Sequence, residues 1–223
     1  NTTQISVNNL LKYIHMDQYK DVKENLLAEI DELIPFNIWD SKHNLINQDK
    51  LLEACDYEKV YESFDYTMMC FKESMRLEAP IGFSTAHTVT QDVVLAKGTK
   101  KELKVNAGQE IHIMMSSLHH DPAQWGARHN EFIPERFDPD SEHFKAPNGK
   151  SRHPYAYAPF FGGHRVCLGK TFAEVVAKKL ITTILKFYTL EHANESMKTE
   201  THEYEIFQMK LPEIHYKFSK RIV

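Results

Sequence analysis

One cysteine near the end of the chain lies on a glycine-rich stretch, directly before a long segment with helical hydrophobic spacing. The stretch runs from Phe160 to Gly169 and reads Phe-Phe-Gly-Gly-His-Arg-Val-Cys-Leu-Gly, so that Cys167 follows Arg165 by two residues. Apolar residues then recur at three- and four-residue steps, which predicts a helix over 168–190. We therefore expect Cys167 beside the positive end of that helix, where an ionised sulfur is favoured.

The composition argues against several classes of protein. The net charge of -4 gives no reason to expect a nucleic acid as a partner. Three cysteines, none close to another in sequence, argue against a disulfide framework. No apolar run is long enough to span a bilayer, and the polar N-terminus carries no signal peptide. Because Asn1 opens directly into a helical pattern, we expect residues 1–223 to be the later part of one domain, with any membrane anchor before them.

Hydrophobic spacing predicts three helices in the first third of the chain. Apolar residues over 1–34 follow helical steps, and the polar stretch His15 to Lys20 is expected to divide them into two helices, the second ending at Pro35. A polar connection is predicted over 37–56. Tyr57 to Leu77 is predicted as one further helix.

The rest of the chain has a different character. Short β-like runs and glycine turns fill 83–115, which predicts small sheets. Residues 119–160 hold most of the prolines and little periodicity, yet they are rich in aromatic residues, so we expect a long irregular segment that is packed and ordered. Weak alternation over 203–218 predicts a terminal β-hairpin.

Two arginines and a glutamate form the second candidate constellation. Glu73 and Arg76 stand three residues apart in the predicted helix, and therefore on one face. Alone, such a pair is most often a solvated surface ion pair that contributes about 0–1 kcal/mol. A further arginine, Arg136, lies between aromatic residues in the irregular segment, within Phe-Ile-Pro-Glu-Arg-Phe at 132–137.

Taken together, these motifs resemble those of the cytochrome P450 family. The family pattern Phe-x-x-Gly-x-Arg-x-Cys-x-Gly is matched at Phe160, Gly163, Arg165, Cys167 and Gly169. A Glu-x-x-Arg helix and a Pro-Glu-Arg-Phe segment precede it in the family's order. The resemblance covers nearly the whole chain. It implies a mainly α fold with small β-sheets, of which this chain would be the C-terminal portion.

The resemblance assigns roles to the cysteine loop. Cys167 would be the axial ligand of the iron of haem b, iron protoporphyrin IX. Phe160 would shield the sulfur from water, and Gly163 would allow the tight turn. Arg165 would pair with a haem propionate, and Gly169 would let the following helix pass close to the macrocycle.

The resemblance also implies a structural network. In the family, the helix glutamate and arginine join the arginine of Pro-Glu-Arg-Phe, and here Glu73, Arg76 and Arg136 would take those places. One carboxylate can accept paired hydrogen bonds from guanidinium groups and so attach an irregular segment to a helix. These residues are expected to be supports, not catalysts.

Three less specific matches complete the candidate site. His87 lies where many family members have an arginine for the second propionate, although a strand histidine without a ligand role is equally open. Thr2 matches the threonine of the oxygen-activating helix, with Asn1 in place of the usual acid, or else both serve as a helix cap. Residues 206–208 are candidates for the substrate pocket.

The implied reaction is monooxygenation of a lipophilic small molecule. Dioxygen would supply the inserted atom, and an NADPH-dependent reductase or another donor would supply the electrons. Lys170, Lys178 and Lys179 either attract an acidic redox partner or form an ordinary solvated face. The expected location is the cytosolic face of the endoplasmic reticulum membrane, with the cytoplasm as the alternative.

Two other functions stay open at this point. One is a haem-thiolate isomerase or dehydratase that uses peroxides and needs no reductase. The other is a truncated haem-binding protein without catalytic activity.

Overall fold

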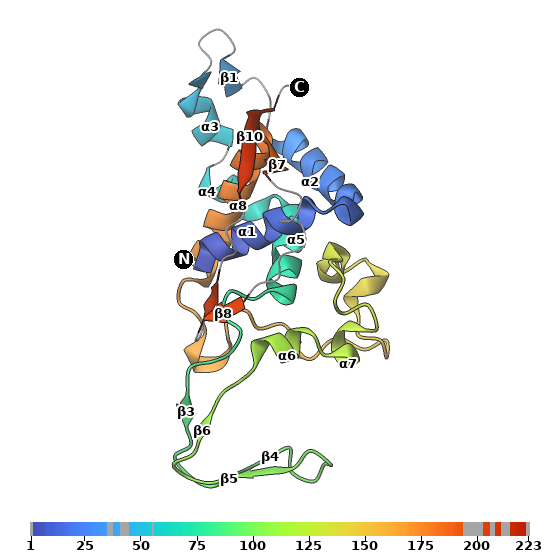
Figure 1. Ribbon diagram of the computed structural model, residues 1–223, viewed down its shortest axis with the longest axis vertical. Coiled ribbons are helices and arrows are strands. Elements are labelled where there is room, and N and C mark those ends of the chain that lie inside the picture. Colours follow the sequence, from blue (N-terminus) through green and yellow to red (C-terminus); the bar gives the residue numbers. More distant parts are fainter. Residues whose placement is uncertain are drawn as a thin grey trace.

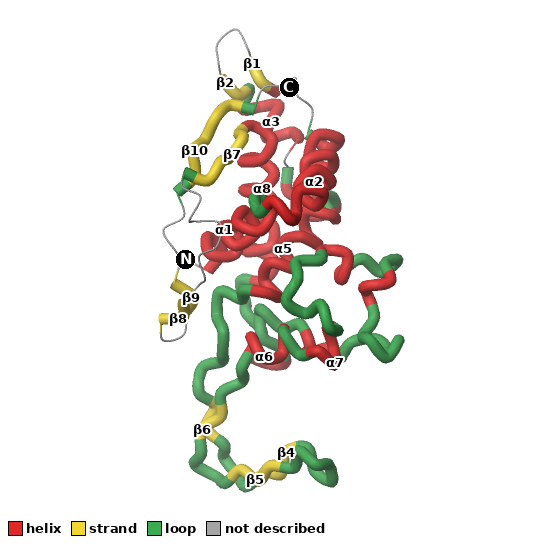
Figure 2. The backbone as a smooth tube through the Cα atoms, turned by 45° about the vertical axis from the view of Figure 1, so that its right-hand side comes forward, coloured by secondary structure: helices red, strands yellow, loops and turns green. Residues whose placement is uncertain are grey.

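The computed structural model shows a helical body with several two-stranded sheets. It describes residues 2–34, 38–40, 45–54, 56–193, 203–205, 208–210 and 215–221. Figures 1 and 2 show the body, which consists mainly of the helices α1 (Thr2–Ile14), α2 (Lys20–Leu33), α5 (Asp65–Leu77) and α8 (Lys170–Phe187). The predicted fold class, mainly α with small β-sheets, is confirmed. Among the described residues, no helix combines the length and the apolar character needed to cross a bilayer.

The apolar faces of these four helices meet in one core. Each helix contributes fully buried side chains, among them Leu10 of α1, Ile30 of α2, Phe71 of α5 and Ile181 of α8. Burying one such side chain contributes about 1.5–3 kcal/mol. Tertiary packing of this kind, more than helix propensity, stabilises helices of 13 to 18 residues.

The predicted break between the first two helices is present. One 3-10 turn, η1 (Asp17–Tyr19), separates α1 from α2. The second helix ends at Leu33, because Ile34 takes an extended backbone conformation with φ -114° and ψ 107°. Pro35 lies outside the described residues.

The prediction of one helix from Tyr57 to Leu77 is wrong. The structure has α4 (Tyr57–Glu62) and α5 (Asp65–Leu77), divided where Phe64 adopts a left-handed conformation with φ 64°. The side chain of Glu29 on α2 explains the new start. Its carboxylate accepts hydrogen bonds from the backbone N–H groups of Tyr66 and Thr67 at 2.7 and 2.8 Å, and so satisfies donors that a helix N-terminus leaves free.

The polar connection predicted over 37–56 contains regular structure. Strands β1 (Trp39–Asp40) and β2 (Leu45–Ile46) pair antiparallel, and α3 (Gln48–Ala54) follows them. Strands and helices this short are below the length at which hydrophobic periodicity distinguishes them from loops.

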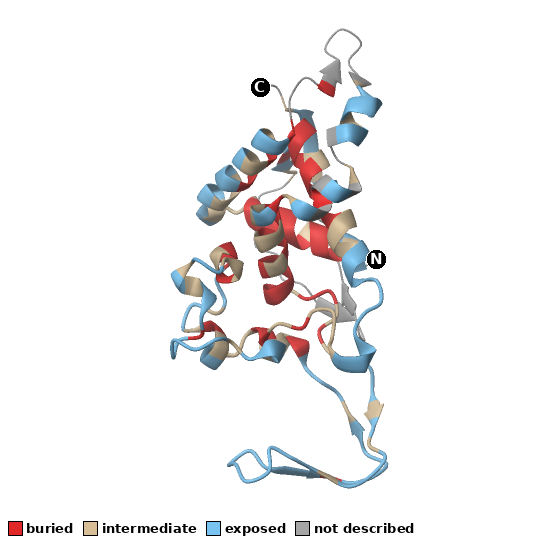
Figure 3. Ribbon diagram, turned by 180° about the vertical axis from the view of Figure 1, so that it is seen from behind, coloured by how far each residue is buried: buried red, intermediate tan, exposed pale blue. Residues whose placement is uncertain are grey.

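The β-like region forms an arm that stands away from the helical body. Strand β3 (His87–Thr88) pairs with β6 (Glu110–Ile111), and β4 (Val93–Leu95) pairs with β5 (Leu103–Val105). Figure 3 shows that nearly all of this arm is exposed. The predicted glycine turns are present.

The irregular segment is ordered by short helical turns, as expected. Side chains within it are buried, including Trp125 at 3% exposure and Phe132 at 2%. Its turns and those of the following loop are α6 (Met115–His119), α7 (Pro122–Trp125), η3 (Pro134–Phe137), η4 (Glu142–Phe144), η5 (Pro154–Ala156) and η6 (Gly163–Arg165).

The C-terminal region differs in part from the prediction. Helix α8 ends at Phe187, and the chain continues directly as β7 (Tyr188–His192), which pairs antiparallel with β10 (Tyr216–Lys220). Strands β8 (Glu203–Glu205) and β9 (Gln208–Lys210) form the expected hairpin. The predicted hairpin range 203–218 also includes the start of β10, which instead pairs with β7 in a separate sheet. Weak alternation alone could not reveal that partner.

Candidate functional site

Glu73 and Arg76 form a buried ion pair at the centre of the structure. Both side chains have 0% exposure. Arg76 Nε and Nη2 donate to the two carboxylate oxygens of Glu73 at 2.7 and 2.8 Å, which is a bidentate arrangement. The other donors of Arg76 reach the backbone oxygens of His119, His129 and Glu131 at 2.9, 2.7 and 3.1 Å. All five guanidinium N–H groups therefore have an acceptor.

Arg136 joins this pair from the irregular segment. Its Nε lies 3.3 Å from Glu73 Oε1, close enough for an ion pair but without hydrogen-bond alignment. Its Nη1 and Nη2 donate to the backbone oxygens of Trp125 and Arg128 at 2.6 and 2.7 Å. The structure thus brings the three predicted network residues together. Burial raises the pKa of Glu73, and the hydrogen bonds from Arg76 oppose that rise.

A third arginine of this region was missed in the sequence. Arg152 donates from Nε to the backbone oxygen of Gln124 at 3.0 Å and from Nη1 to that of Arg136 at 3.0 Å. Its guanidinium lies 4.3 Å from the ring of Trp125, and Arg76 lies over the same ring at 4.8 Å. Burial lowers the pKa of Arg152 to about 10. It belongs to no recognised motif, so only its place within an aromatic-rich segment could have indicated this role.

The cysteine loop is a tight turn between the irregular segment and α8. Gly163 has φ 63°, a conformation that glycine adopts without steric cost, as predicted. Gly162 is extended, but a Cβ there would collide with the ring of Tyr155, so close packing also requires a glycine. Phe161 has φ 65°, which is a strained conformation for a residue with a side chain.

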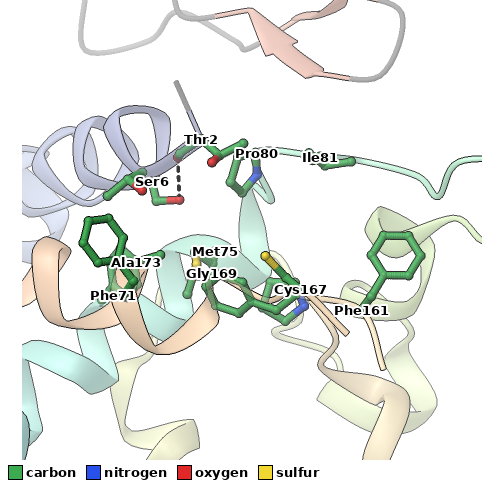
Figure 4. Close-up of a pocket in the computed structure, with 14 residues that line it drawn as sticks. Thr2, Ser6, Phe71, Met75, Pro80, Ile81, Phe161, Cys167, Gly169 and Ala173 are labelled. Atoms are coloured by element: carbon green, nitrogen blue, oxygen red, sulfur yellow. Dashed lines mark hydrogen bonds between the residues drawn. The ribbon is translucent and has the colours of Figure 1, made fainter. Parts of the chain in front are cut away.

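The sulfur of Cys167 is open to a cavity. The backbone N–H of Cys167 donates to the oxygen of Phe160 at 2.8 Å and closes the loop. Gly169 directly precedes α8, which places Cys167 beside the N-terminus of that helix. Cys167 is exposed, whereas Cys70 is buried in the core. Figure 4 shows the sulfur pointing into the cavity, on the side of Pro80.

The cavity has a volume of about 280 Å³ and a largely apolar lining. Helix α1 contributes Thr2 and Ser6, whose hydroxyl donates to the backbone oxygen of Thr2 at 3.0 Å. Helix α5 contributes Phe71 and Met75. The remaining lining residues are Thr3, Pro80, Ile81, Pro159, Phe160, Phe161, Cys167, Gly169, Phe172 and Ala173. Segments far apart in the sequence therefore meet around one sulfur.

Not every predicted residue reaches this cavity. Arg165 is exposed on η6, and His87 is half-buried in β3, paired with Ile111. Neither lines the cavity. The Nε2 atom of His87 is buried and has no hydrogen-bond partner among the described residues. Asn1 and two residues of the predicted 206–208 pocket segment lie outside the described residues.

The predicted lysine face is partly wrong. Lys170 and Lys179 are exposed, but Lys178 is buried at 7% exposure. Its ammonium donates to the backbone oxygens of Val60 and Ser63 at 3.1 and 2.7 Å, at the break between α4 and α5. Lys178 is therefore not part of a surface for a partner.

Comparison with known proteins identifies the family. The cytochrome P450 family model matches residues 1–218, and the chain belongs to that family. Human cytochrome P450 4F2 is 31% identical over 188 residues, which cover 83% of this chain and 31% of that protein. Mouse thromboxane-A synthase is 29% identical over 192 residues, which cover 85% of this chain and 31% of that protein. The chain thus spans about a third of the length of these relatives.

Solved structures show the same fold. The crystal structure of the cytochrome P450DA heme domain matches with a TM-score of 0.72 at 22% identity, covering 99% of this chain and 42% of that one. A mutant of the same heme domain matches with a TM-score of 0.71.

The residues around Cys167 fit the haem that the family implies. One exposed cysteine faces an apolar cavity, and the described residues contain no group of three or more histidine, cysteine, aspartate or glutamate side chains that could hold a metal ion. A single thiolate donor suits one axial position on a haem iron. The lining residue Phe172 is 73% exposed, which is apolar surface that a large planar cofactor would cover.

Proposed function

We propose that this chain is part of a haem-thiolate monooxygenase. It would form a single domain together with other residues of that protein. The observation that carries the proposal is the accessible sulfur of Cys167 in an apolar cavity that Thr2 also lines. When bound, haem b would supply the activation of dioxygen, which thiolate ligation favours by pushing electron density to the iron.

The proposed cofactor contacts follow from the placement of each residue. Cys167 would hold the haem iron through its sulfur, Phe160 would exclude water from that sulfur, and Gly169 would leave room for the haem beside it. Arg165, which is exposed within the loop, would hold one propionate. His87, with its unpartnered Nε2, would donate to or pair with the other.

Thr2, which lines the same cavity as Cys167, is proposed as the residue that would hold a water molecule or dioxygen for proton delivery. Ser6 also lines the cavity, but its hydroxyl already donates its proton to the backbone oxygen of Thr2. We therefore assign the role to Thr2 and not to Ser6. The aromatic and aliphatic lining favours a lipophilic substrate. Electrons would come from an NADPH-dependent reductase or another donor, and the expected site of action is the endoplasmic reticulum membrane.

The test is the absorption spectrum of the reduced, carbon monoxide-bound protein, measured on the complete protein beside Cys167→Ser. A strongly red-shifted Soret band that the substitution abolishes is the expected result. A spectrum that Cys167→Ser leaves unchanged would contradict the assignment of Cys167 as the ligand.

A second candidate is an isomerase or dehydratase that consumes a peroxide. The similarity to mouse thromboxane-A synthase supports this second candidate, because that relative is named a synthase and not a hydroxylase. The two candidates differ in their need for electrons. Turnover of lipophilic substrates that requires NADPH and a reductase supports the monooxygenase, whereas peroxide turnover without either supports the isomerase.

A further inference from the structure

One buried histidine connects the arginine network to the cysteine loop. His119, the last residue of α6, has 0% exposure. Its backbone oxygen accepts a hydrogen bond from Arg76 Nη1 at 2.9 Å, and its ring Nε2 accepts one from the backbone N–H of Ala158 at 2.9 Å. The same residue is thus bonded to helix α5 and to the segment that leads into the loop.

The bond to Ala158 continues toward the sulfur. The backbone oxygen of Ala158 accepts from the N–H of Phe161 at 3.0 Å, and the oxygen of Phe160 accepts from the N–H of Cys167 at 2.8 Å. Ala158 itself is buried, at 6% exposure. Without the His119 ring, its N–H would lose its acceptor, and leaving a buried donor unsatisfied is costly.

The geometry determines the protonation state of the ring. A backbone amide always donates, so Nε2 must carry a lone pair and the proton of the neutral ring must be on Nδ1. Burial, with a smaller contribution from Arg76, lowers the pKa of His119 to about 3 and keeps the ring neutral near pH 7. Tyr157 stacks on the ring with centroids 5.5 Å apart, which holds its plane toward Ala158.

We propose that His119 is a positioning residue for Cys167: its Nε2 holds the backbone at Ala158 and thereby the base of the loop that presents the sulfur. The inference rests on the haem-thiolate function proposed above. Packing alone would not suffice, because the role needs a hydrogen-bond acceptor at the position of Nε2.

Two substitutions distinguish the role of Nε2 as a hydrogen-bond acceptor from the packing of the His119 ring. His119→Phe keeps an aromatic ring against Tyr157 but offers no acceptor, whereas His119→Gln offers a side-chain oxygen. Both would be made in the full-length protein with haem. The readouts are the exchange rate of the Ala158 amide hydrogen, followed by mass spectrometry, and the fraction of reduced, carbon monoxide-bound protein with the red-shifted Soret band.

We expect both the protection of the Ala158 amide and the red-shifted fraction to fall in His119→Phe and to recover together in His119→Gln. His119→Phe should speed exchange at Ala158 by about tenfold or more and lower the red-shifted fraction, and His119→Gln should recover much of both. If His119→Phe folds and leaves both readouts unchanged, the proposal is overturned. If His119→Phe does not fold, His119→Gln is the test variant. In that variant the protection of the Ala158 amide from hydrogen exchange and the red-shifted fraction must either both be kept or both be reduced. A change in only one of the two readouts overturns the proposal.

A matched control removes the effect of general stability. Asp31→Asn weakens the remote contacts of Asp31 with Arg221 and Lys186, at 2.6 and 3.1 Å, and touches neither His119 nor the loop. If Asp31→Asn lowers the red-shifted fraction as much as His119→Phe does, His119 acts only through stability and the proposal is overturned. A wild-type protein that lacks the red-shifted band would instead refute the haem-thiolate function itself.

Discussion

The arginine network and the cysteine loop are connected through His119 but are built in opposite ways. Glu73 and Arg76 are fully buried, and each donor of Arg76 has an acceptor. The loop is exposed, holds Phe161 in a strained conformation and leaves the sulfur of Cys167 accessible. A residue that stabilises the fold benefits when all its hydrogen-bonding groups have partners, whereas a ligand atom must stay free to bind. In this chain the first role belongs to Glu73 and Arg76 and the second to Cys167.

The largest expected effect comes from breaking the network. Glu73→Gln removes the one negative charge between Arg76 and Arg136 and leaves two buried guanidinium groups without a counter-charge. We expect the free energy of unfolding, measured in urea on the full-length protein, to fall by about 3–5 kcal/mol.

The exposed pair Arg128–Glu131 provides the control for that prediction. Its atoms are also 2.7 Å apart, but its side chains are 58% and 49% exposed. Glu131→Gln should therefore lower the free energy of unfolding far less than Glu73→Gln does, because solvent screens an exposed ion pair. Equal losses in the two variants would show that burial does not distinguish the pairs.

A smaller effect should appear as a dependence on pH through His119, which links the two regions. Its pKa is lowered from 6.5 to about 3 in the folded protein, so the unfolded chain binds the proton first as the pH falls. Stability from this group is complete above pH 6.5 and declines toward pH 3. Between pH 7 and pH 5 the part of the loss that comes from His119 should be about 2 kcal/mol.

His119→Gln cannot titrate and should lack that part of the loss. Urea unfolding of both proteins at pH 7 and pH 5 measures the difference. Other groups that titrate here, such as His15 and His120, are present in both proteins and largely cancel. Identical pH slopes would mean that His119 is not held neutral by the fold.

The smallest effect is expected in the loop itself. Phe161→Gly should raise the free energy of unfolding by about 0.5–1 kcal/mol, because glycine adopts a positive φ without strain, although it loses more entropy on folding. Thermal unfolding would detect the change.

The neighbouring position should respond in the opposite direction. Gly162→Ala places a Cβ against the ring of Tyr155 and should lower the unfolding temperature. If both substitutions shift that temperature the same way, the loop is not held in the conformation described.

Local patterns made much of the site predictable. Glu73 and Arg76 share a helix face, and the glycines around Cys167 indicate a turn. The ion pair and the cysteine loop could therefore both be recognised from the spacing of residues in the sequence. Arg152 could not, because it acts through backbone oxygens that only the folded chain brings near it.

The fold shows the same limit. The helices with long apolar stripes were predictable, but the break at Phe64 was not, because no glycine or proline marks it. Tertiary contacts supply it: Glu29 accepts from the first N–H groups of α5, and Lys178 donates to the carbonyl oxygens that end α4. Their sequence separation from Phe64 hides both contacts from any local pattern.

The exposed β4–β5 hairpin has a consequence for variation among relatives. Its strands contact chiefly each other, and the turn between them at Gly98 has open space around it. Exposed tips of this kind tolerate insertion and deletion better than packed elements do. Lengthening or shortening this turn would leave the hydrogen bonds around Cys167 intact, so the arm can diverge while the chemistry stays the same.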